Sequence, residues 1–128
     1  MVCLDTDILV GFLRNDKDAL KKIEELNEKN EALAVSPVVV CELYKGAFRS
    51  TKENYINFIE THIDGLIILE INRMTCRLYG EHKEKLKHAP IGDFDLLIAC
   101  TALAHNERVI TRNLREFEKV EDLKVEKW

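Results

Sequence analysis

The chain has 128 residues, of which 46% are hydrophobic and 33% are charged, and its net charge is −4. This length and composition predict one folded domain over residues 1–128 and exclude disordered and fibrous classes. No apolar run approaches the roughly 20 residues that a membrane-spanning helix requires, and no signal-peptide pattern opens the sequence, so we expect a cytoplasmic protein with no membrane partner. The acidic balance also excludes a nucleic-acid binder that relies on bulk positive charge.

Four cysteines are spread along the sequence without a metal-ligand spacing. Cys3, Cys41, Cys76 and Cys100 form no C-x-x-C pair, and no histidine lies at ligand spacing from them. This pattern argues against a zinc site or a redox pair. We expect the thiols to be small buried side chains in a reducing compartment.

The first half of the chain alternates short apolar runs with amphipathic segments. The apolar runs Val2–Leu4 and Leu33–Val35 predict two strands. Apolar residues at helical spacing predict four helices. We place these helices from Ile8 to Arg14, after an Asp16 or Asp18 cap, from Pro37 to Ala47 behind Ser36, and over Asn54–Ile63.

The second half of the chain continues the alternation. Leu66–Ile71 is apolar at nearly every position, which is typical of a parallel strand covered on both faces. Helices are expected over Met74–Leu86 and Asp95–Ala104, and further strands at Val109–Ile110 and Leu123–Val125. Strands that alternate with helices predict an α/β fold, a three-layer α/β/α sandwich with a mainly parallel central sheet.

Several acidic residues fall where functional groups gather in such a sheet. Asp5 ends the first strand, Asp93 and Asp95 open an apolar helix, and Glu42 interrupts another. Each has a structural explanation, because aspartates cap helices and Lys45 could pair with Glu42. Taken together, carboxylates at the carboxyl ends of parallel strands repel one another, and Mg²⁺ would relieve that repulsion. Such an ion can also activate water for attack on a phosphodiester.

Four segments carry distinctive patterns in a fixed order, namely Leu4–Leu9, Ser36–Ala47, Ile91–Ala99 and Thr111–Phe117. In residues and order they resemble the motifs of PIN-domain ribonucleases, and most closely those of the VapC toxins of VapBC toxin–antitoxin pairs. The tail Val120–Trp128 also resembles the usual end of that family. The resemblance spans nearly the whole chain and implies a PIN-like fold.

The resemblance also implies an activity, a cofactor and partners. It implies an Mg²⁺-dependent endoribonuclease, with Mn²⁺ able to substitute, that cleaves RNA as the toxin of a type II toxin–antitoxin pair. A small VapB-like antitoxin would inhibit it. A homodimer is expected as well, with candidate contacts at Tyr55, Phe58, Ile59 and the Met74–Leu86 helix.

The principal site residues follow from the same resemblance. It implies that Asp5, Glu42 and Asp95 are the catalytic acids that bind Mg²⁺. Many PIN domains have a fourth aspartate where this chain has Asn113, and Glu116 is the candidate replacement as a catalytic acid. The neutral Asn113 amide leaves open whether one or two metal ions bind.

Further polar residues are expected around these acids, in contact with the substrate or with the metal ligands. They are Thr6, Asp93, Thr111, Arg112 and Asn113. Asp93 is either an auxiliary ligand or the cap of its helix, and we favour the cap.

The alternatives to the nuclease are a receiver-type phosphoacceptor domain and a non-catalytic PIN-like RNA-binding module. A receiver-type phosphoacceptor domain needs an aspartate that ends the middle strand and a lysine after a late strand. Leu66–Ile71 passes into Asn72, and Val109–Ile110 passes into Thr111, so the sequence lacks both landmarks. A non-catalytic PIN-like RNA-binding module stays open because of Asn113.

Overall fold

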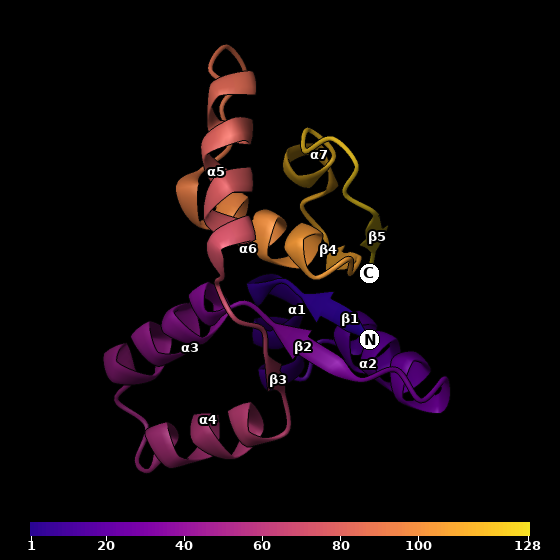
Figure 1. The fold of residues 1–128 in the computed structure, drawn as a ribbon. Coiled ribbons are helices and arrows are strands. Elements are labelled where there is room, and N and C mark those ends of the chain that lie inside the picture. The colour runs from indigo at the N-terminus through magenta and orange to yellow at the C-terminus, as the bar shows by residue number, and fades with distance from the viewer.

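Five short parallel strands form the central sheet of the structure, a computed structural model that describes residues 1–128 (Figure 1). The sheet has the order β3-β2-β1-β4-β5, and every neighbouring pair of strands is parallel. The strands are β1 (Val2–Leu4), β2 (Leu33–Val35), β3 (Ile67–Ile68), β4 (Val109–Thr111) and β5 (Val125–Lys127). This sheet confirms the predicted parallel α/β class.

Strand β1 occupies the middle of the sheet. Cys3 is in register with Ala34 of β2 on one side and with Val109 of β4 on the other. All three residues of β1 are fully buried. Asp5, the next residue, therefore lies where the most buried strand of the protein meets its first helix.

Seven helices surround the sheet and complete the predicted three-layer sandwich. Three pairs pack against each other, α1 with α2, α3 with α4, and α5 with α6. In Figure 1 α5 extends to the top of the view with α6 beside its lower end, and the α3–α4 pair lies at the lower left. The helices are α1 (Thr6–Leu13), α2 (Lys17–Glu28), α3 (Pro37–Arg49), α4 (Tyr55–Asp64), α5 (Arg73–Lys85), α6 (Asp93–Ala104) and α7 (Leu114–Phe117). None of them has the length and apolar character that crossing a membrane would require.

Side-chain caps define where the first three helices begin. Asp5 caps α1, and Asp16 caps α2 by accepting hydrogen bonds from the backbone N–H groups of Asp18 and Ala19. Ser36 caps α3 by accepting from Val38, with proline at the first helical position. The cap predicted at Ser36 is confirmed, and Asp16 rather than Asp18 is the cap of α2.

The predicted strand boundaries need correction at the edges of the sheet. The expected strand Leu66–Ile71 is reduced to Ile67–Ile68, and these side chains are 46% and 50% exposed. Successive side chains of a strand point to opposite faces, so the prediction that this strand is covered on both faces is wrong. β3 lies at the edge of the sheet and pairs only with β2. The last strand lies at Val125–Lys127, two residues later than the expected Leu123–Val125.

Helix boundaries differ from the prediction by one or two residues, and one short helix is additional. Helix α6 begins at Asp93 and not at Asp95, and the short helix α7 was not predicted. Apolar residues three positions apart, at Leu114 and Phe117, are the signal for α7. The segment is too short for this spacing to be distinctive.

The cysteines divide into two groups. Cys3 and Cys100 are buried, and burial raises the pKa of the Cys3 thiol to about 12. Cys41 and Cys76 are exposed on α3 and α5, so the prediction that all four are buried is wrong for these two. Both lie on helices that turn only one face toward the core, and the apolar character of cysteine does not determine which face it occupies.

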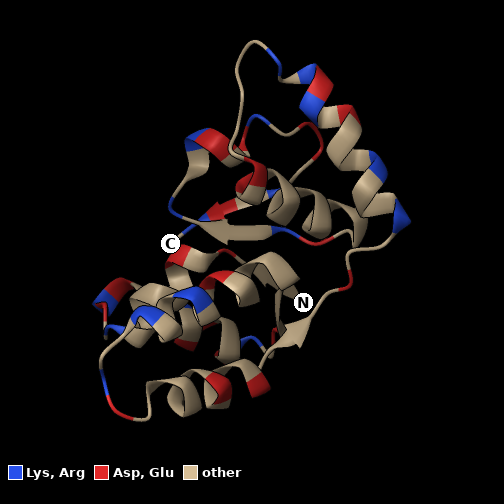
Figure 2. Cartoon of the chain, turned by 90° about the vertical axis from the view of Figure 1, so that its left-hand side faces the viewer, with Lys and Arg blue, Asp and Glu red and all other residues tan.

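Charged residues are distributed over the helices with the two signs mixed. Figure 2 shows that Lys and Arg positions are mixed with Asp and Glu positions along the chain, for example along α5. Arg108 pairs with two acids that are distant in the sequence, since its guanidinium lies 3.0 Å from Glu31 and 2.8 Å from Glu126. A polyanionic ligand must therefore be bound by a local arrangement of groups and not by a broad basic surface.

We expect Phe117→Ala to lower the free energy of unfolding by about 3–5 kcal/mol, because it removes a fully buried ring. Phe48→Ala is the matched control, since that ring is 71% exposed and its loss should change stability by less than about 0.5 kcal/mol. Urea unfolding followed by circular dichroism measures both values. Equal losses in the two variants would contradict the position assigned to α7.

Candidate functional site

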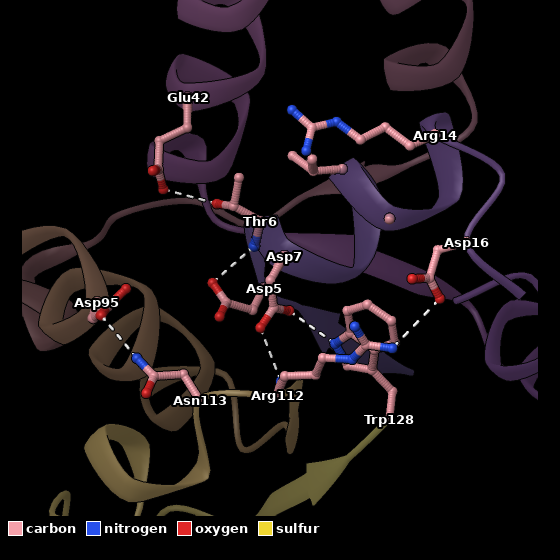
Figure 3. A pocket seen from close by; sticks show the side chains of 12 residues that line it. Asp5, Thr6, Asp7, Arg14, Asp16, Glu42, Asp95, Arg112, Asn113 and Trp128 are labelled. Atoms are coloured by element: carbon pink, nitrogen blue, oxygen red, sulfur yellow. Dashed lines mark hydrogen bonds and ion pairs between the residues drawn. The ribbon is translucent and has the colours of Figure 1, made fainter. Parts of the chain in front are cut away.

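A pocket of about 650 Å³ opens beside Asp5, at the carboxyl end of β1. Its wall contains five carboxylates and two guanidinium groups, and Figure 3 shows these side chains pointing into the same space. The lining comes from α1 and its cap, the segment between α1 and α2, α3, α6, the loop after β4 and the residue after β5. The lining residues are Asp5, Thr6, Asp7, Val10, Gly11, Arg14, Asp16, Glu42, Asp95, Arg112, Asn113 and Trp128.

The carboxylate of Asp5 is the most buried acid of the pocket, with only 5% of the residue exposed. Its Oδ1 accepts a hydrogen bond from the backbone N–H of Thr6 at 2.7 Å, and its Oδ2 accepts one from Thr111 Oγ1 at 2.7 Å. Burial raises the pKa of Asp5 to about 7, and the neighbouring charges of Asp7 and Asp95 act in the same direction. Ionising Asp5 therefore costs more free energy in the folded protein than in the unfolded chain.

Glu42 extends from α3 toward the first turn of α1. Its Oε1 accepts a hydrogen bond from Thr6 Oγ1 at 2.7 Å, which links the two helices across the pocket. The expected alternative, an ion pair with Lys45, does not form. Glu42 is therefore oriented by a neutral hydroxyl, and its negative charge is not compensated by a basic side chain.

Asp95 lies in the first turn of α6, beside Asp5 and on the same side of it as Glu42 in Figure 3. Burial raises its pKa, and the charges of Glu42 and Glu116 raise it further. Asn113 Nδ2 donates to Asp95 Oδ2 at 3.4 Å and offsets part of this shift. No ion pair of the structure includes Asp5, Glu42 or Asp95.

Two acids expected at the site lie outside the pocket lining. Asp93 accepts hydrogen bonds from Lys83 Nζ at 2.6 Å and from the Tyr79 hydroxyl at 2.8 Å, and these contacts lower its pKa. Gly92 is the N-cap residue of α6 and the Asp93 side chain makes no capping bond, so the preferred cap role of Asp93 is wrong. Glu116 pairs with Lys119 at 3.1 Å and influences the site through its charge near Asp95.

Thr111 and Arg112 support the pocket from the end of β4. Thr111 is fully buried, and its hydroxyl accepts from the backbone N–H of Asn113 while it donates to Asp5. The backbone N–H of Arg112 donates to Asp7 Oδ2 at 2.8 Å. These contacts place a buried hydroxyl and a guanidinium next to the acids.

Sequence reasoning did not identify Asp16 and Trp128 as residues of the pocket. Asp16 was interpreted only as a cap, yet it also lies 3.4 Å from Arg112 Nη2. Trp128 Nε1 donates to Asp7 Oδ1 at 2.9 Å. The available signal was that Trp128 is the single tryptophan of the chain, since a partly buried indole N–H requires an acceptor.

The donor set of the pocket suits a hard divalent cation. Its potential ligands are carboxylate, hydroxyl and amide oxygens, with no histidine or cysteine in the lining. The structure contains no preassembled cluster of three or more His, Cys, Asp or Glu side chains at metal-binding geometry. The oxygen donors of the lining fit Mg²⁺, which takes few direct carboxylate ligands and keeps several waters.

We expect Asp5→Asn to stabilise the metal-free protein at pH 8. Burial favours the protonated carboxyl, so between the ordinary value of 3.8 and about 7 the folded state keeps a proton that the unfolded chain has released. Stability therefore falls as the pH rises through this range. The neutral amide avoids this loss, and the variant should be more stable than wild type by about 1–3 kcal/mol at pH 8 and equally stable near pH 4.

Urea unfolding in the presence of a chelator at both pH values measures this difference. Thr111 can keep a hydrogen bond in the variant, because its hydroxyl can donate to Asp7 Oδ2, 3.2 Å away, and accept from the new amide. A variant that is less stable than wild type at pH 8 would contradict the unfavourable ionisation of Asp5.

Comparisons with known proteins assign this chain to a family. The sequence matches the PIN domain over residues 2–123. It is 36% identical to Ribonuclease VapC1 of Haemophilus influenzae strain R2866 over 98% of this chain and 96% of that protein. The structure is similar to chains of VapBC-1 from nontypeable Haemophilus influenzae (TM-score 0.89, 36% identity, 100% and 98% of the two chains) and of VapBC2 from Rickettsia felis (0.88, 32%, 100% and 99%). The chain therefore belongs to the PIN-domain family, on its VapC branch.

Proposed function

We propose that this protein is an Mg²⁺-dependent endoribonuclease that acts in the cytoplasm as the toxin of a type II toxin–antitoxin pair. The observation that carries the proposal is the meeting of Asp5, Glu42 and Asp95 in one pocket without a basic side chain paired to any of them. A cation would relieve their repulsion and lower the cost of ionising Asp5. The ribonuclease names of the VapC relatives support RNA as the substrate.

The three acids would hold the ion directly and through water, and Mn²⁺ could use the same oxygen ligands. A bound Mg²⁺ would polarise the scissile phosphate and lower the pKa of the attacking water. The protein's own groups orient the ligands, because each acid accepts a hydrogen bond from a neutral neighbour. These pairs are Thr6 with Glu42, Thr111 with Asp5, and Asn113 with Asp95.

The RNA backbone would approach along the basic part of the rim. Arg14 and Arg112 line the pocket and offset its negative charge at the edge. Guanidinium groups bind phosphate oxygens in two-point contacts that position the chain without reading its sequence. This arrangement supports cleavage of an RNA strand by an acidic protein, because two guanidinium groups lie directly at the site.

We also propose a VapB-like antitoxin and a second copy of this chain as partners. The similar VapC structures were determined as VapBC complexes, which supports the antitoxin. Phe58 and Met74, two of the expected dimer contacts, are 43% and 49% exposed. Ile59 is only 2% exposed and packs in the core of the protomer, so it is excluded from the dimer interface.

The alternative of a non-catalytic RNA-binding module depends on Asn113. The amide adds no charge to the pocket and is hydrogen-bonded to Asp95. Such a module would bind RNA without metal-dependent cleavage, and a mixed RNA pool incubated with Mg²⁺ or with chelator separates the two functions.

We expect Asp5→Asn and Asp95→Asn each to lower the rate of Mg²⁺-dependent RNA cleavage by at least about 100-fold, since each removes a charged ligand. Asp93→Asn is the matched control on the same helix as Asp95, because its carboxylate pairs with Lys83 outside the pocket. Initial rates on a labelled single-stranded RNA measure the effect. Full activity of Asp5→Asn, or equal loss in Asp93→Asn, would contradict the proposed site.

Asn113→Asp should strengthen Mg²⁺ binding, because it adds a carboxylate next to Asp95. We expect the dissociation constant measured by calorimetry to fall by roughly tenfold, which corresponds to about 1.4 kcal/mol. Glu116→Ala is the comparison, and its effect should be smaller because Lys119 already compensates that charge. An unchanged affinity of Asn113→Asp would show that position 113 lies too far from the ion to bind it.

A further inference from the structure

Trp128 occupies a specific seat at the rim of the pocket. Its indole packs on α1 at Gly11, where an added Cβ would lie 2.9 Å from Trp128 Cη2 and 3.0 Å from the Cβ of Ala19. A side chain at position 11 would therefore displace the ring. The absence of a side chain at Gly11 allows the end of β5 to reach the pocket.

The indole N–H contacts Asp7 (Figure 3), and Asp7 in turn lies beside Thr111, the residue whose hydroxyl donates to Asp5. Trp128 Nε1 donates to Asp7 Oδ1 at 2.9 Å. Asp7 Oδ2 accepts from the backbone N–H of Arg112 at 2.8 Å and lies 3.2 Å from Thr111 Oγ1. Thr111 donates to Asp5 Oδ2 at 2.7 Å. One aromatic side chain is thus connected to the central carboxylate through two polar residues.

The face of the same indole holds the guanidinium of Arg112. The Arg112 Cζ lies 3.6 Å from the ring centroid, which is a close cation–π contact. Arg112 Nη2 also lies 3.2 Å from Asp18 and 3.4 Å from Asp16. These contacts hold the positive group at the rim, where an incoming phosphate would meet it.

We propose that Trp128 is a positioning residue of the carboxylate site, acting through its N–H on Asp7, Thr111 and Asp5 and through its ring on Arg112. This inference rests on the proposed nuclease function. The N–H orients the groups around the metal ligand, and the ring orients the group that binds phosphate. The two roles separate by substitution, because phenylalanine keeps the aromatic face and loses the donor.

The first experiment compares Trp128→Phe with Trp128→Leu in RNA cleavage. Trp128→Phe should raise the half-saturating Mg²⁺ concentration by roughly fivefold, because Asp7 loses the hydrogen bond that holds it beside Thr111. The KM for RNA should stay unchanged, because the aromatic face under Arg112 is kept. Trp128→Leu should show the same effect on Mg²⁺ and in addition raise KM severalfold, since Arg112 loses its aromatic support. Wild-type values of both parameters in both variants would overturn the proposal.

Two further variants separate positioning from a general loosening of the last strand. Gly11→Ala adds a methyl group that meets the indole and Ala19, without changing a polar group. It should raise the half-saturating Mg²⁺ concentration, as Trp128→Phe does. Val125→Ala is the matched control, because it trims a partly buried side chain of β5 outside the pocket. It should lower thermal stability and leave the Mg²⁺ requirement unchanged. An equal rise of the half-saturating Mg²⁺ concentration in Val125→Ala would show that Trp128 acts only by holding the strand.

A measurement with Mg²⁺ alone makes the test independent of RNA cleavage. The chain has one tryptophan, so its indole N–H gives a single cross-peak in a ¹H–¹⁵N spectrum. We expect Mg²⁺ to shift this peak in the wild type and not in Asp5→Asn. Calorimetric Mg²⁺ binding with an unmoved peak would overturn the positioning role and leave the proposed function standing. No Mg²⁺ binding by the wild type would overturn both.

Discussion

The burial of a single carboxylate is the constraint on which the site depends. Asp5 follows the fully buried β1, caps α1 and accepts a hydrogen bond from Thr111 at the end of β4. It therefore joins the central strand, the first helix and the neighbouring strand in one residue. Its raised pKa shows that the fold keeps an acid where ionisation is unfavourable. A cap alone does not require such burial, and a buried acid with other acids around it is typical of a functional site.

The order of the strands explains which residues surround Asp5. β2 and β4 flank β1 in the sheet, so α3 after β2 and the loop after β4 approach from either side and contribute Glu42 and Asn113. Helix α6 packs near α3 and contributes Asp95. Loops at the carboxyl ends of adjacent parallel strands converge, and this geometry brings together acids that are distant along the chain.

Local sequence patterns were most informative where an element is buried or capped. The strands at Val2–Leu4 and Leu33–Val35 were predicted with their observed bounds. A short continuous apolar run is typical of a strand that is buried on both faces of a parallel sheet. The helix behind Ser36 was predicted from its cap and proline. Edge strand β3 was predicted too long, since apolar composition alone does not reveal whether a second face is covered.

By itself the sequence determined the α/β class, the buried β1 and the acids that could serve as ligands. Tertiary structure decided which of those acids share a pocket. Asp93 and Asp95 are two positions apart, which is about 200° around a helix, so only one of them faces the site. Trp128 contacts Asp7 from 121 positions away in the chain. No local pattern encodes that contact, because it depends on where the sheet places strand β5 relative to helix α1.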